Sequence, residues 1–229
     1  MTDMEPRRDE EFENFLQSWK IFSGDLSLVG AEDRLKPQDP FSPPDDAMDI
    51  DGEHTYHLTI MEGGKPEIIA KLKQIKVLAL TCMDWRFANS YYDHIQEESA
   101  RSQDEILFVG VGGGAVQLPE ERQEALLNIL GFISRNAPEL EKVYLSGHTH
   151  RCGAVAHWLH AEKGELPKEL GPQKGGVVEI EKMGDMLKAG TEKLKAVFRP
   201  EVLVESDLLS LDRIDERGRK TTITLNRLP

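Results

Sequence analysis

Short apolar runs alternate with amphipathic segments along most of the chain. The runs at residues 76–81, 105–110 and 142–146 are continuous, which is typical of strands buried on both faces of a parallel sheet. Two further strands are predicted at 202–204 and 221–225, and helices are predicted at 66–74, 87–98, 120–136, 154–161 and 180–198. Strands and helices that alternate at this spacing predict an α/β fold with a mostly parallel central sheet and helices on both faces.

The N-terminal part of the chain follows a different pattern. Between residues 10 and 22, five large apolar side chains recur every three or four positions, which on a helix gives one apolar stripe: Phe12, Phe15, Leu16, Trp19 and Phe22. Residues 36–53 contain repeated prolines and acidic side chains, which favour an extended connector. We therefore predict an N-terminal helical arm with its connector at 1–55 and an α/β domain at 56–229. The apolar stripe needs a surface to cover, either on this domain or on a neighbouring subunit.

Acidic residues are concentrated in the arm. Residues 1–53 hold 15 of the 41 Asp and Glu residues and 5 of the 28 Lys and Arg residues, so they carry −10 of the net charge of −13. A negative surface repels nucleic-acid phosphates, so we expect no nucleic-acid binding. No apolar run reaches the roughly 18 residues that a membrane-spanning helix needs, and the N-terminus lacks the features of a signal peptide. We expect a soluble, cytoplasmic protein.

The two cysteines of the chain stand close to the ends of two predicted strands. Cys82 directly follows the first strand, and Cys152 lies a few residues after the third strand, beyond His148 and His150. The carboxyl ends of strands in an α/β sheet are where such folds build their sites. Two thiolates and one imidazole suit a catalytic zinc ion that keeps one coordination position for water. The alternative is two unrelated core thiols, but the paired contexts in a reducing compartment favour metal ligands.

Three segments, taken in order, resemble motifs of the β-class carbonic anhydrases. These are Cys82-Met83-Asp84-Trp85-Arg86, similar to the family's Cys-x-Asp-x-Arg; the glycine-rich turn from Gly110 to Gly114; and Gly147-His148-Thr149 with Cys152-Gly153, similar to Gly-His-Thr-x-Cys-Gly. The resemblance covers roughly residues 66–206. It implies a zinc site formed by Cys82, His148 and Cys152. It also implies reversible hydration of carbon dioxide to bicarbonate through attack by zinc-bound hydroxide.

The resemblance gives roles to two further residues. It implies that the Asp84 carboxylate accepts a hydrogen bond from the zinc-bound hydroxide and that Arg86 holds this carboxylate in a bidentate pair. An ordinary ion pair that braces a loop is the alternative for both residues. Because members of the family pair their subunits, the resemblance also implies a homodimer or a higher homo-oligomer.

The loop before the second cysteine is one residue longer than the family's His-x-x-Cys. Either His148 or His150 can therefore be the ligand, and we predict His148 because it keeps the order Gly-His-Thr at the end of the third strand. Trp85 also stands where serine is commonest in the family, and the second strand lacks an Arg-Asn pair before its glycines. These differences leave open a zinc protein of the same fold that acts on another small heterocumulene, such as carbonyl sulfide or carbon disulfide, or that has no catalytic activity.

Overall fold

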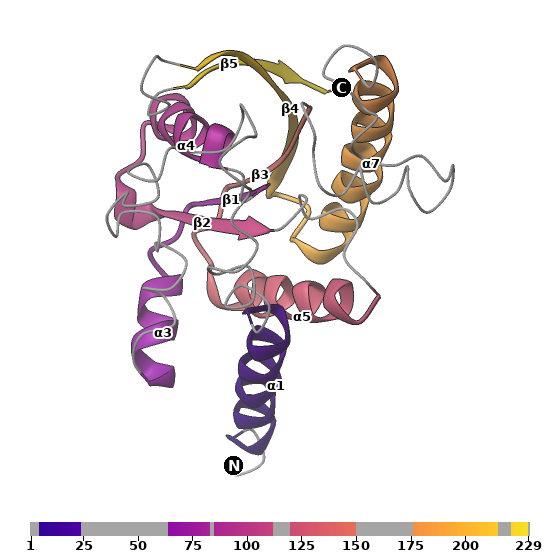
Figure 1. Cartoon of the computed structure of the whole chain (residues 1–229). Helices are drawn as coiled ribbons and strands as arrows, with labels where there is room; N and C mark the ends of the chain where they lie inside the picture. Colours follow the sequence, from indigo (N-terminus) through magenta and orange to yellow (C-terminus); the bar gives the residue numbers. More distant parts are fainter. Residues whose placement is uncertain are drawn as a thin grey trace, which may run out of the picture.

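The computed structural model describes residues 5–23, 64–82, 85–111, 120–149, 176–214 and 221–228 of the 229-residue chain (Figure 1). Within these residues, a five-stranded sheet with the order β2-β1-β3-β4-β5 forms the centre of the fold. Its strands are β1 (Val77–Cys82), β2 (Ile106–Val111), β3 (Lys142–His148), β4 (Leu203–Ile214) and β5 (Thr221–Arg227). The first four strands are parallel and β5 is antiparallel to β4, so the predicted mostly parallel sheet is confirmed.

The order of the strands reverses next to β1. The chain passes from β1 outward to β2 at one edge of the sheet, and it then returns to β3 on the opposite side of β1. In open α/β sheets, such a reversal creates a crevice at the carboxyl ends of the two strands that flank it. Here those strands are β1 and β3, which pair in parallel from Val77 opposite Lys142 to Leu80 opposite Leu145.

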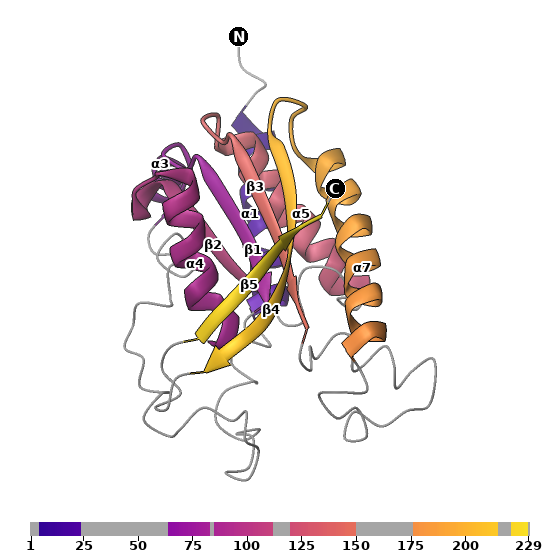
Figure 2. The same cartoon turned by 90° about the horizontal axis from the view of Figure 1, so that it is seen from above.

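Helices cover both faces of the sheet, as the sequence predicted (Figure 2). On one face lies α4 (Trp85–Ser99), which contacts β1, β2, β4 and β5. On the other face lie α5 (Glu120–Asn136) and α7 (Gly176–Val197), which contact each other. The short helix α3 (Lys65–Leu72) precedes β1, and the 3-10 turn Gln103–Glu105 precedes β2. None of the helices in the described ranges is long and apolar enough to cross a membrane.

Two apolar cores fill the space between these layers. Leu78 and Leu80 of β1 belong to the larger core, which includes side chains of α5 and α7, whereas Val77 and Ala79 belong to the smaller core beneath α4. Successive side chains of a strand point to opposite faces, which explains this division. Because both faces of β1 are covered, every residue of the strand is buried, and the sequence is a continuous apolar run.

The helix of the N-terminal arm, α1 (Glu5–Ser23), packs against α5 of the same chain. The Phe15 ring, which is 2% exposed, stacks on the Phe132 ring of α5 with the centroids 4.2 Å apart, and Phe12 packs beside them. The part of the apolar stripe whose side chains are described, from Phe12 to Trp19, is therefore covered within one chain, and its burial does not require a neighbouring subunit. The predicted division of the chain at residue 55 falls outside the described residues and stays a prediction.

Among the strands, β4 differs most in length from its prediction. The sequence predicted a strand at 202–204, whereas β4 contains 12 residues. Glu205 and Asp207 interrupt the apolar pattern, but both carboxylates are held by ion pairs, so the strand continues past them. The predicted helix at 154–161 lies among residues that the structure does not describe.

Candidate metal centre

Two of the predicted ligands lie at the carboxyl ends of the strands that flank the reversal. Cys82 is the last residue of β1, and His148 is the last residue of β3. Because β1 and β3 are parallel neighbours, both residues reach the same edge of the sheet. Both are buried, with 6% of Cys82 and 1% of His148 exposed. The fold therefore places two residues that are far apart in sequence at the ends of neighbouring strands.

Two contacts hold the His148 side chain in one orientation. Its imidazole stacks on the Phe87 ring of α4, with the centroids 4.4 Å apart and an angle of 22° between the ring planes. Its Nδ1 lies 2.7 Å from the carbonyl oxygen of Thr149. A carbonyl oxygen can only accept a hydrogen bond, so Nδ1 is the protonated nitrogen in this contact and Nε2 carries the lone pair. Metal-binding histidines are commonly oriented by such a bond from their second nitrogen.

The carbonyl group that orients His148 is itself anchored to β4. The Thr149 amide donates a hydrogen bond to the carbonyl oxygen of Leu209 at 3.0 Å, and the Thr149 hydroxyl donates to the same oxygen at 3.4 Å. Leu209 is the residue of β4 that pairs with His148, and β4 continues beyond it. Functional roles for Thr149 and Phe87 are not predictable from the sequence motifs, although Thr149 belongs to one motif and Phe87 adjoins another.

The Cys82 side chain lies on the face of the sheet opposite the His148 ring. Thr81, the residue before Cys82, is joined directly to β3, because the Ser146 hydroxyl donates to the Thr81 hydroxyl at 2.6 Å. Side chains alternate along a strand, so Cys82 points to the face covered by α5 and α7, whereas the His148 ring lies against α4. An ion bound by both residues would therefore lie beyond the strand ends.

Gly147, the residue before His148, permits the close approach of α7 to β3. A Cβ atom at this position would overlap the Met183 sulfur and would lie 2.9 Å from the Met183 Cγ. Because Met183 is fully buried, it has little room to move aside. The glycine of the Gly-His-Thr motif thus has a packing role in addition to its place beside a predicted ligand.

The other predicted site residues are not placed by the described part of the structure. Asp84, His150 and Cys152 lie outside it, and Arg86 belongs to the first turn of α4 but its side chain is not described. Among the residues that are described, no group of three or more His, Cys, Asp and Glu side chains is arranged to hold a metal ion. The structure therefore places two members of the predicted set at the ends of neighbouring strands, with side chains on opposite faces of the sheet, and Cys152 stays a prediction.

The two ligands that the structure does describe match zinc in chemical type. Thiolate sulfur and imidazole nitrogen are the donors that zinc sites use, whereas magnesium and calcium sites are built from oxygen atoms. Cys82 ends a buried strand, and the ring and Nδ1 of His148 are both held by neighbours. Rigid donors of this kind fit a zinc ion, provided that a third residue completes the set.

A second polar cluster, which the sequence did not predict, lies between α4 and strands β3, β4 and β5. Asp207 has no exposed surface and accepts hydrogen bonds from the Tyr91 hydroxyl at 2.7 Å and from Arg227 Nε at 3.0 Å. Arg227 also donates to both carboxylate oxygens of Glu98, each at 2.9 Å. Burial and then the nearby Asp207 carboxylate raise the pKa of Tyr91 well above its usual value, so its hydroxyl stays a donor.

Lys142 extends this cluster to the amino-terminal end of β3. Its ammonium group lies 3.0 Å from Glu98, 2.9 Å from Glu205 and over the Tyr144 ring. Hydrogen bonds from Arg227 and then from Lys142 and Tyr144 hold the pKa of Glu98 well below its usual range, although burial opposes the shift. The carboxylates are thus paired with cations of the protein itself, as in a structural ion-pair network.

Comparisons with known proteins add no constraint on the function. No family model, no curated protein and no solved structure matches this chain. The functional argument therefore depends on the sequence motifs and on the geometry of the described residues.

Proposed function

We propose that the protein is a zinc-dependent carbonic anhydrase of the β class, which interconverts carbon dioxide and bicarbonate. The observation that carries the proposal is the orientation of His148, whose Nδ1 donates to a backbone carbonyl while Nε2 carries the lone pair that a metal ion would bind. Cys82 supplies a thiol at the same edge of the sheet. Both residues belong to motifs that occur in the order expected for this family.

The topology of the sheet supports the same proposal. Ligand sites in open α/β folds lie at the carboxyl ends of the strands where the strand order reverses. Cys82 and His148 end the two strands, β1 and β3, between which this reversal occurs.

Each residue of the proposed site has a role that follows from its chemistry. Cys82, His148 and Cys152 hold zinc, which supplies a Lewis acid that makes hydroxide available from water near neutral pH. Asp84 accepts a hydrogen bond from the nucleophile and directs its lone pair toward carbon dioxide. Arg86 holds the Asp84 carboxylate in place through a bidentate pair.

Stopped-flow measurement of carbon dioxide hydration with a pH indicator tests this proposal. The protein should accelerate proton release, and elemental analysis should find about one zinc ion per chain. Protein that holds zinc but hydrates no carbon dioxide would contradict the proposal and favour the alternative, a zinc protein that acts on carbonyl sulfide or carbon disulfide or that has no activity. Protein that takes up no zinc on reconstitution would contradict both.

Paired variants identify the histidine ligand. His148→Ala should abolish zinc binding and hydration activity, because it removes the imidazole that is oriented at the end of β3. His150→Ala should retain the metal and should at most alter the rate. The opposite pattern in zinc titrations would show that His150 is the ligand and that our alignment of this loop is wrong.

A further inference from the structure

The end of β3 that carries His148 lies between two helices. On one face, the His148 ring stacks on Phe87 of α4, with the centroids 4.4 Å apart. On the other face, α7 approaches Gly147 so closely that a Cβ atom there would overlap the Met183 sulfur and would lie 2.9 Å from the Met183 Cγ. Adjacent residues of a strand face opposite sides, so the two contacts hold the same stretch of backbone from opposite directions.

Backbone pairing alone does not hold this stretch on both of its edges. The described pairing of β1 with β3 ends at Leu145, three residues before His148. From Ser146 onward β3 is paired with β4, and the hydrogen bond from the Ser146 hydroxyl to the Thr81 hydroxyl joins it to β1. Side-chain packing on the two faces therefore contributes to the position of His148.

Met183 lies where it can fix this position. It has no exposed surface, and neither has Leu187, which lies one turn further along α7 and would be 3.4 Å from the same Cβ atom. The overlap involves the Met183 Cγ as well as its sulfur, so a movement of the side-chain tip alone would not remove it. Because α7 contacts both β3 and β4, the helix cannot move away from Gly147 without losing packing on both strands.

We propose that Met183 is a positioning residue for His148, the predicted zinc ligand. Its contact with Gly147 holds the end of β3 at a fixed distance from α4. The His148 ring thereby keeps its stack on Phe87, and its Nδ1 stays bonded to the Thr149 carbonyl. The consequence for metal binding rests on the proposed function, because it assumes that Nε2 of His148 binds zinc. The orientation of the ring can be measured without metal, so the two proposals can fail separately.

A double-mutant cycle tests the proposal, with zinc affinity measured by competition with a chelator. Gly147→Ala adds a methyl group that overlaps Met183, and Met183→Ala removes the side chain that contacts Gly147, so each should lower zinc affinity about tenfold or more. The two changes together should bind zinc more tightly than either alone, because the added methyl group occupies space that the shortened side chain leaves. Independent changes would instead multiply to a loss of about a hundredfold or more.

The same cycle in the chelated protein tests the orientation without zinc. Long-range proton–nitrogen NMR shows which ring nitrogen of a histidine carries the proton, and the loss of signals in His148→Ala identifies those of His148. The unaltered protein and the double variant should carry the proton on Nδ1, whereas Gly147→Ala and Met183→Ala should each lose part of this preference. This pattern in a protein that takes up no zinc would support the positioning role while contradicting the proposed function.

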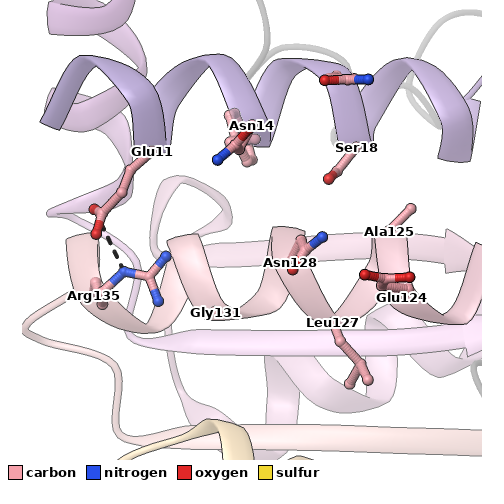
Figure 3. Close-up of a pocket in the computed structure, with 11 residues that line it drawn as sticks. Glu11, Asn14, Ser18, Glu124, Ala125, Leu127, Asn128, Gly131 and Arg135 are labelled. Atoms are coloured by element: carbon pink, nitrogen blue, oxygen red, sulfur yellow. Dashed lines mark ion pairs between the residues drawn. The ribbon is translucent and has the colours of Figure 1, made fainter. Parts of the chain in front are cut away.

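Three changes serve as controls. Gly184→Ala adds a methyl group to α7 beside Met183, where among the described residues it would meet no other segment within 4 Å. Gly131→Ala adds one to α5 in the groove between α1 and α5, where it would lie 3.3 Å from the tip of the exposed Arg135 side chain (Figure 3). Leu72→Ala removes a fully buried side chain of the same core, in α3. Leu72→Ala should lower thermal stability, but all three should leave zinc affinity and the ring signals unchanged.

Several outcomes would overturn the proposal. They are unchanged ring signals in Gly147→Ala, losses that multiply in the double variant, and a loss of zinc affinity in Leu72→Ala as large as that in Met183→Ala. If Gly147→Ala does not fold, Met183→Leu decides the matter, because it conserves volume and should behave as the unaltered protein does. Equal ring signals in Met183→Leu and Met183→Ala would then refute the role of Met183.

Discussion

Buried polar side chains gather in two regions of the sheet, and the two regions satisfy them in different ways. Between α4 and the strands β3, β4 and β5, the buried Asp207 and the partly exposed Glu98 are both bonded to Arg227, so that charge is compensated within the protein. At the carboxyl ends of β1 and β3, the buried groups are the thiol of Cys82 and the imidazole of His148. There the neighbouring groups orient a donor and do not neutralise a charge.

This comparison separates a structural network from a chemical site. Burying a charge is costly unless an opposite charge and hydrogen bonds accompany it, so the first region is saturated by its own residues. Burying a thiol or a neutral imidazole costs less free energy than burying a charge, and both groups carry lone pairs that suit a metal ion. We therefore expect substitutions in the first region to change stability and substitutions in the second to change metal binding.

The largest effect is expected for Cys82→Ser, which removes a thiolate from the proposed metal centre. Zinc and hydration activity should be lost, and the free energy of unfolding should fall because bound metal contributes to folding. Elemental analysis and thermal melts measure the two effects. Melts of the chelator-treated unaltered protein provide the control, since they should resemble those of the variant. Zinc at full stoichiometry in the variant would refute the assignment.

Arg227→Ala should have the next largest effect, on stability alone. It leaves the fully buried Asp207 without its cation, and breaking a buried pair in this way costs about 3–5 kcal/mol. Urea unfolding measures the loss. Lys195→Ala, which breaks the exposed pair with Glu192, should cost less than about 1 kcal/mol. A large fall in zinc content with Arg227→Ala would contradict the separation of the two regions.

At acidic pH, the free energy of unfolding should depend on the protonation of Glu98. Its pKa is lowered in the folded protein, chiefly by Arg227, so its stabilisation is fully present above the unfolded value of about 4.3 and is lost as pH falls toward the folded value. In that window the unaltered protein should lose up to about 1.4 kcal/mol per pH unit more than Glu98→Gln. Urea unfolding of both proteins with the metal chelated measures the difference. Equal slopes would show that the network does not hold the Glu98 carboxylate.

The smallest effect is expected for Phe87→Leu, which removes the ring that stacks on His148 but keeps an apolar side chain. Zinc affinity should fall by about tenfold, because residues that orient a ligand contribute to this extent. Competition with a chelator measures the affinity. Phe108→Leu makes the same chemical change in a ring that packs on Tyr92, and it should leave zinc affinity unaltered. Equal losses in both variants would point to general loosening of the core.

Prediction from sequence succeeded where the apolar pattern is continuous and failed where packing or charge pairing decides the structure. The buried runs that became β1, β2 and β3 were predicted to within two residues at either end, and the predicted bounds of α5 agree with Glu120–Asn136. By contrast, most of β4 was missed, because Asp207 is an unfavourable residue for a buried strand until Arg227 and Tyr91 are brought beside it. Those partners are distant in sequence, so no local pattern predicts them.

The sequence by itself determined which chemical groups are available and which predicted strands they follow. Cys82 follows the first strand, and the histidines and then Cys152 follow the third. Only the tertiary structure decided that β1 and β3 are neighbours, that His148 is held by the Thr149 carbonyl, and that Phe12 and Phe15 of the apolar stripe are covered by their own chain. The physical reason is that side-chain type and period are local properties. Strand order, ring orientation and helix docking depend on contacts between distant segments, which exist only after the chain has folded.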